Sequence, residues 1–150
     1  MIMDFIKKTE NKIFLLVLTV VIFFGFIDSQ QILGTYLSQN WDAYNNFIAP
    51  YFIVSWYLAL IGMGVLYYLL KKDKSEALSI VAAGFVLLFF GLEDLSFFIF
   101  SSESMGACMD WFTYYPWKLF SCVTPTILII SSIVGIFISY KVFIYLRRRW

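Results

Sequence analysis

The chain has 150 residues, of which 61% are hydrophobic, 21% aromatic and only 14% charged, and its net charge is +1. This composition lies far outside that of a soluble domain and indicates an integral membrane protein. The near-neutral charge and the lack of a basic arm exclude nucleic acid as an expected partner. The chain has no histidine, which is the commonest metal ligand and acid-base residue, so we expect neither a metal nor a cofactor.

Four apolar runs follow one another along the chain, separated by polar connections. Each run provides the roughly 20 residues needed to cross a bilayer. The first follows a leader with three lysines but lacks a small-residue cleavage pattern, so we expect an uncleaved helix rather than a signal peptide. The sequence predicts one domain, 1–150, an all-α integral membrane protein built as a four-helix bundle. The predicted transmembrane helices cover about residues 13–37, 51–70, 76–100 and 119–145.

The basic residues predict the orientation of the bundle. Ten of the eleven fall in the leader, in the turn at 71–75 or near the C-terminus, whereas Lys118 alone falls in the loops at 38–50 and 101–118. The positive-inside rule therefore places both termini and the 71–75 turn in the cytoplasm. The two aromatic loops are then expected on the extracytoplasmic side.

Two adjacent acids, Glu93 and Asp94, interrupt the third apolar run near its outer end. Ionisable side chains within a membrane are costly, and they usually face a protein interior or a wet cavity. Neighbouring positions on a helix point about 100° apart. The two carboxylates therefore cannot both face one point, and we expect one of them to face the bundle.

Asp28 is expected at a depth similar to Glu93, since both lie roughly 22–24 Å along parallel helices at 1.5 Å per residue. We predict a polar layer beneath the outer loops, and two interpretations of it stay open. It is either an outward cavity for a cation, a proton, an amine or a lipid, or a structural hydrogen-bond network with Lys118 as counter-ion. The candidate residues are Asp28, Gln31, Glu93, Asp94 and Lys118.

Two further patterns concern packing and cross-linking. Cys108 and Cys122 are both expected on the oxidising side, where a disulfide would stabilise the fold by about 3 kcal/mol. Two free thiols, or a soft-metal site that includes Met105 and Met109, are the alternatives.

On the fourth helix, small residues at four-residue spacing predict close helix packing, within this chain or with another. These residues are Ser131, Gly135 and Ser139.

Three functions follow from these patterns. The first is a non-catalytic accessory or scaffolding subunit of a larger membrane complex, because the soluble loops are short and no catalytic motif is present. The second is a transport or binding protein that handles a ligand, an ion or a proton in the acidic layer. The third is a lipid-modifying membrane enzyme with Glu93 or Asp94 as general acid or base. The expected partners are membrane lipids, together with other membrane subunits or further copies of the chain.

Overall fold

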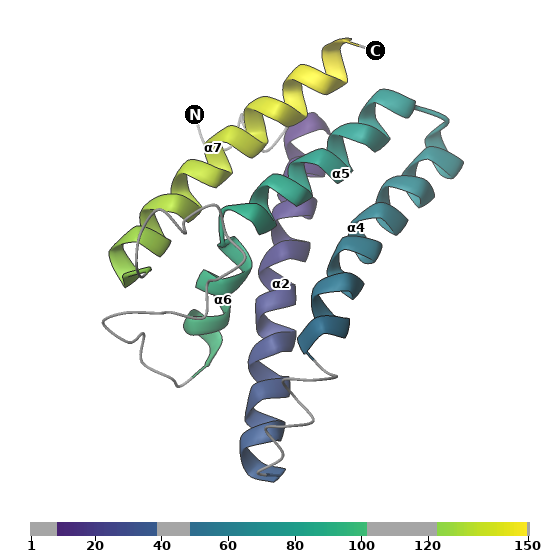
Figure 1. Ribbon diagram of the computed structural model, residues 1–150. Coiled ribbons are helices and arrows are strands. Elements are labelled where there is room, and N and C mark those ends of the chain that lie inside the picture. The colour runs from purple at the N-terminus through teal and green to yellow at the C-terminus, as the bar shows by residue number, and fades with distance from the viewer. Residues whose placement is uncertain (1–8, 39–48, 102–122, 150) are drawn as a thin grey trace.

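The computed structural model describes residues 9–38, 49–101 and 123–149, and its side chains over 11–30, 54–101 and 123–149. All the regular elements described there are helices, as the sequence predicts. They are α2 (Thr9–Ser38), α4 (Ala49–Lys71), α5 (Lys74–Phe89), α6 (Leu92–Phe100) and α7 (Pro125–Arg149), and Figure 1 shows their arrangement.

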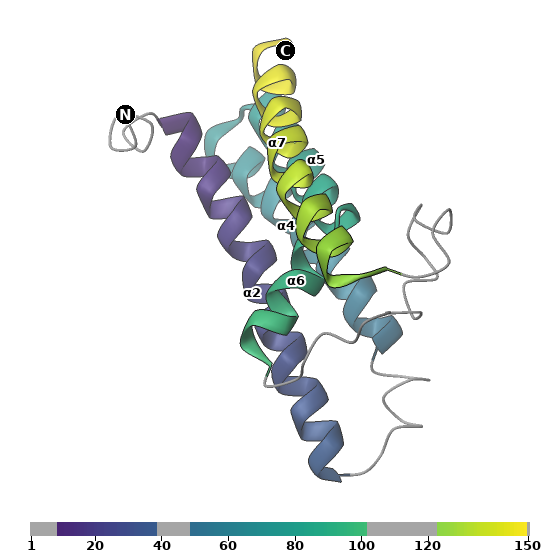
Figure 2. The same ribbon diagram turned by 90° about the vertical axis from the view of Figure 1, so that its left-hand side faces the viewer.

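Helix α5 is the centre of the assembly. It packs against α7, α4 and α2, while α6 lies mainly against α2 (Figures 1 and 2). The main core forms where these faces meet, from apolar side chains that are almost completely buried. They include Phe14, Val17 and Val21 of α2, Leu60 of α4, Ile80, Ala83 and Leu87 of α5, and Phe143 of α7.

The third predicted helix is not continuous, which corrects the expectation of one helix over 76–100. α5 and α6 are bent by 63° at the break between them. Gly91 makes the bend with φ = +76°, a left-handed conformation that only glycine adopts readily. The carbonyl of Phe90 accepts a hydrogen bond from the hydroxyl of Ser131 at 3.0 Å. The carbonyl of Gly91 accepts the backbone N–H of Leu95 at 2.9 Å and also the hydroxyl of Ser132 at 3.2 Å. Hydroxyls of a neighbouring helix thus add hydrogen bonds to the backbone where the helix is interrupted.

The last helix begins at Pro125, six residues later than the predicted start at 119. Thr124 caps it, since its hydroxyl accepts a hydrogen bond from the backbone N–H of Ile127 at 3.3 Å. Proline suits the first helical position because its missing N–H would have no partner there. The helix therefore starts where the cap and the proline occur together, and not where the apolar run starts.

Three described helices are long and apolar enough to cross a membrane, and the bent α5–α6 pair is a fourth if it counts as one span. Large apolar side chains also cover the outer faces of α4 and α7, as Leu70 and Phe137 show with exposed fractions of 72% and 67%. This surface is compatible with a lipid environment. The three continuous spans are Asn11–Gln30, Val54–Lys71 and Pro125–Arg149.

Candidate functional site

The break in the third helix places Glu93 in the first turn of α6, inside the bundle. Its exposed fraction is only 5%, and its Oε1 atom is buried without a hydrogen-bond partner in the part of the chain that the structure describes. A buried polar atom of this kind is costly, because the water that it loses is not replaced by a donor. Glu93 is therefore the described residue whose chemistry most needs an explanation.

Helix α2 holds the backbone of Glu93 from one side. Gly25 of α2 packs so closely that a Cβ atom there would overlap the Glu93 carbonyl, the Ser96 hydroxyl and the Phe97 amide nitrogen. The Ser96 hydroxyl itself donates to the Glu93 carbonyl at 2.7 Å. This hydroxyl therefore serves the backbone of Glu93 and not its carboxyl group.

The described charged groups that interact with Glu93 are negative. Asp94 follows it on α6, and Asp28 lies on α2 one turn beyond Gly25; both interact electrostatically with Glu93 and are half-buried. The structure thus brings together three of the five residues predicted for the polar layer. Gln31 lies on α2 one turn after Asp28, but its side chain is outside the described residues, as is the whole of Lys118.

This arrangement limits the chemistry that is available at Glu93. An ionised carboxylate in an apolar interior needs an opposite charge or several donors, and otherwise takes up a proton. The two neighbouring acids make a bare negative charge at Glu93 still less favourable. The site is therefore suited to holding a small positive species.

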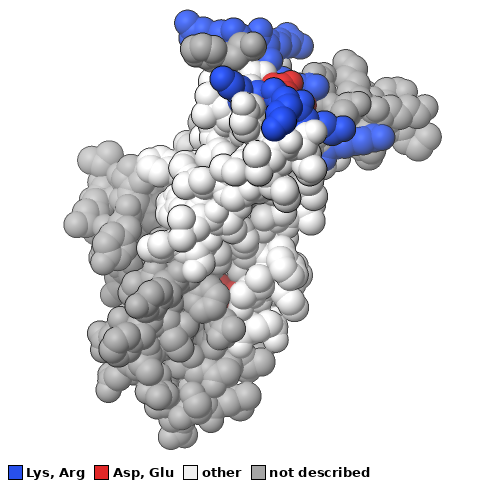
Figure 3. All heavy atoms as spheres, turned by 90° about the vertical axis from the view of Figure 1, so that its right-hand side faces the viewer, with Lys and Arg blue, Asp and Glu red and all other residues white. Residues whose placement is uncertain are grey.

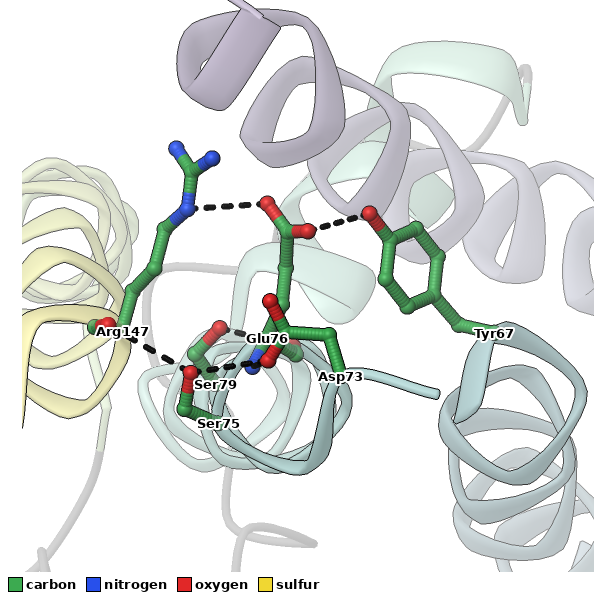
Figure 4. A network of polar contacts seen from close by, with 6 residues as sticks. All are labelled: Tyr67, Asp73, Ser75, Glu76, Ser79 and Arg147. Carbon is green, nitrogen blue, oxygen red and sulfur yellow. Dashed lines mark hydrogen bonds and ion pairs between the residues drawn. The ribbon is translucent and has the colours of Figure 1, made fainter. Parts of the chain in front are cut away.

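A second buried glutamate, Glu76, lies at the opposite end of α5 and, unlike Glu93, has a counter-ion. Tyr67 of α4 donates its hydroxyl hydrogen to one carboxylate oxygen of Glu76, and Arg147 of α7 pairs with the other at 2.9 Å (Figure 4). Glu76 has the same exposed fraction as Glu93, 5%. It joins α4, α5 and α7 at one point, so it has a structural role.

Asp73 lies beside Glu76 and is the N-cap of α5. The backbone N–H of Glu76 donates to Asp73 Oδ1 at 3.0 Å, and the Ser75 hydroxyl donates to the same oxygen at 2.9 Å (Figure 4). These two hydrogen bonds lower the pKa of Asp73 from its ordinary value. The sequence signal for this helix start is an N-cap residue followed three positions later by glutamate, within the segment predicted as a turn at 71–75.

The small residues of α7 lie on α5 of the same chain. The Ser131 and Ser139 hydroxyls donate to the carbonyls of Phe90 and Ala83 at 3.0 and 2.8 Å, and Gly135 packs against the Phe90 ring. Two of these three contacts fall at the helix break, so this face supports the bend. The predicted disulfide between Cys108 and Cys122 lies outside the described residues.

No protein-family model matches the chain, and neither the curated proteins nor the solved structures give a match. The role of the site is therefore inferred from its own geometry. Within the described residues, no group of three or more acidic or cysteine side chains is placed to hold a metal ion.

Proposed function

We propose that the chain is a multi-pass membrane protein that binds a small cation, either a proton or a metal ion, at Glu93. The observation that carries this proposal is the buried Oε1 atom, which has no hydrogen-bond partner among the described residues. Ionisable groups inside membrane segments are rare and usually mark ion or proton sites. Glu93 also has a matched counterpart in Glu76, which shows how the same fold pairs a buried glutamate when its role is structural.

The helix break supports this function. Where membrane helices are interrupted, the ends of the half-helices and the side chains beside them often form ion sites. Here Glu93 is the second residue of α6, and the Ser131 and Ser132 hydroxyls hold the carbonyls of the break. These serine contacts stabilise the interrupted helix. We propose that their role is to position Glu93.

The charge distribution supports an outward-facing site. Lys and Arg side chains gather at one end of the molecule, around the α4–α5 turn and the end of α7 (Figures 1 and 3). The first turn of α6 lies well away from that end (Figure 1). Under the positive-inside rule the basic end is cytoplasmic, and the Glu93 site then lies toward the outer leaflet.

Thermal unfolding of the purified protein in lipid nanodiscs tests the proposal. A cation that binds only the folded state raises the melting temperature as its concentration rises. We expect the wild-type melting temperature to rise with acid or with one of Na⁺, K⁺ or Ca²⁺, and Glu93→Gln to lose this dependence. Glu76→Gln is the matched control and should keep it. A wild type that does not respond to pH between 5 and 9 or to any of these ions would refute the proposal.

The accessory or scaffolding subunit is our second candidate, and α4 is the element that favours it. Only 17% of its membrane-span residues are buried, against 33% in the spans of α2 and α7. Its buried contact is narrow: Leu60 packs under Gly84, and Gly64 packs against Val81. The remaining surface of α4 is available to a partner subunit, a second copy of the chain or lipid. Gentle release from the host membrane followed by native mass spectrometry should then find foreign chains in fixed ratio; their absence would refute this role.

The lipid-modifying enzyme stays a third hypothesis, with Glu93 or Asp94 as general acid or base. Assay of the purified single component on labelled membrane lipids tests it. Turnover that Glu93→Gln and Asp94→Asn leave unchanged would exclude these roles.

A further inference from the structure

We infer that the species bound at Glu93 is a proton, so that the side chain is a neutral carboxylic acid in the folded protein at neutral pH. This inference rests on the proposed function, because it names which small cation the site holds. It makes the helix break a proton-binding element. Three observations lead to it: the oxygen ligands available at the site, the packing of the Glu93 backbone, and the sign of the neighbouring charges.

The first observation is the number of oxygen atoms available. A bound calcium ion takes six to eight oxygen ligands, and a magnesium ion requires six in a strict octahedron. In the described residues, Asp28, Asp94 and Glu93 do not converge on one point as the ligands of a metal ion would. A proton needs a single carboxylate oxygen, which Glu93 supplies with its buried Oε1 atom.

The second observation is the tight packing on both sides of the break. On the α2 side, Gly25 already touches the Glu93 backbone closely enough to leave no room for a methyl group. On the α7 side, a Cβ atom on Gly91 would come within 2.9 Å of the Leu128 side chain. This packing fixes the backbone from which the Glu93 carboxyl group extends, and a proton adds nothing that it would have to accommodate.

The third observation is the sign of the surrounding charges. The ionisable groups that interact with Glu93 from its own helix and from α2 are Asp94 and Asp28, both acids. From α7 and the end of α5, the described side chains at the break are Ser131, Ser132, Leu128 and Phe90, none of which is ionisable. With no described basic group to balance it, the charge at Glu93 is removed most simply by a hydronium ion of the solvent, which gives its proton to form an O–H bond on the carboxylate and leaves a water molecule.

Infrared spectroscopy of the full chain in nanodiscs, with ¹³C-labelled glutamate side chains, tests this inference. The chain has four glutamates, Glu10, Glu76, Glu93 and Glu103. We expect one labelled carboxyl group to be protonated at pH 7, with the same intensity in sodium and potassium buffers. The signal should be absent in Glu93→Asp, whose aspartate carries no label, and in Glu93→Gln. It should persist in Glu76→Gln.

The outcomes separate this inference from the proposed function. If all four labelled glutamates are ionised at pH 7 while a metal ion still raises the melting temperature through Glu93, the site binds a metal ion and the proton assignment is wrong. If all four are ionised and no cation affects stability, both proposals fail. A protonated signal that survives in both Glu93 variants also overturns the inference, because it belongs to another glutamate.

Discussion

Glu76 and Glu93 are equally buried but differ in their neighbours. Arg147 and Tyr67 surround Glu76, whereas Glu93 has acids nearby and a carboxylate oxygen that bonds to none of the described residues. An acid within an apolar run marks Glu93 in the sequence. Glu76 carries no such mark, because it follows a lysine-rich turn and its partners, Tyr67 and Arg147, lie on two other helices. A pairing between residues 76 and 147 depends on how helices pack, which local sequence does not specify.

The first prediction compares these two glutamates. Glu76→Gln leaves Arg147 without its counter-ion, so we expect the free energy of unfolding to fall by about 2 kcal/mol. Glu93→Gln replaces a neutral acid by an amide of the same shape, so we expect a change below about 1 kcal/mol at pH 7. Unfolding in mixed micelles with increasing SDS measures both. A larger loss for Glu93→Gln than for Glu76→Gln would contradict the assigned roles.

The second prediction concerns the cap at Asp73. Asp73→Ala removes the acceptor for the first turn of α5, and we expect a loss of about 1 kcal/mol. The folded-state pKa of Asp73 lies below its ordinary value of 3.8, so its stabilisation is complete above about pH 4. That stabilisation is lost as the pH falls through the folded-state value. The difference between wild type and Asp73→Ala should therefore be constant from pH 5 to 8 and shrink in stronger acid. A difference that grows in acid would show that the carboxylate is not the cap.

At the level of elements, the apolar runs predicted the approximate place of the helices that are long and apolar enough to cross a membrane, which are three, or four if the bent α5–α6 pair counts as one span. They did not predict the break, because Gly91 stands in an apolar run like several other glycines. What distinguishes Gly91 is its left-handed backbone, together with the Ser131 and Ser132 hydroxyls of α7, which donate hydrogen bonds to the carbonyls of Phe90 and Gly91. Each serine lies 41 residues from the carbonyl to which it donates. The bend is therefore recognised only once α5 and α7 are placed together.

The third prediction tests how α2 holds α6. Gly25→Ala forces a methyl group into the Glu93 backbone and the Ser96 hydroxyl, so we expect a loss of about 1–3 kcal/mol in unfolding free energy. Gly62→Ala is the matched control, because a Cβ atom on Gly62 meets nothing within 4 Å. The same unfolding assay compares the two variants. Equal stability of both would show that the contact between α2 and α6 is not tight in solution.

For the molecule as a whole, the sequence predicted an all-helical chain, and the described residues agree. The sidedness is still a prediction, since it depends on a membrane and on the basic residues that gather at one end (Figure 3). It decides which compartment exchanges protons with Glu93. The polar layer is described only in part, because Lys118 and the side chain of Gln31 lie outside the described residues.

The fourth prediction is the orientation itself. Reporter fusions at Trp150 should be active only with a cytoplasmic reporter, and insertions at Asn45 only with an extracytoplasmic one. The reverse pattern would place the Glu93 site toward the cytoplasm. A single point mutation is not expected to change this pattern, because ten of the eleven basic residues contribute to it.

The measurement that tests the central claim most directly is a count of protons released on unfolding. Wild type and Glu93→Gln would be unfolded with SDS at pH 7 in weakly buffered solution that contains a pH-sensitive dye. Unfolding exposes Glu93 to water, where a glutamate is ionised at this pH. The account predicts that wild type releases one more proton per chain than Glu93→Gln. Equal release from the two proteins would show that Glu93 holds no proton in the folded state.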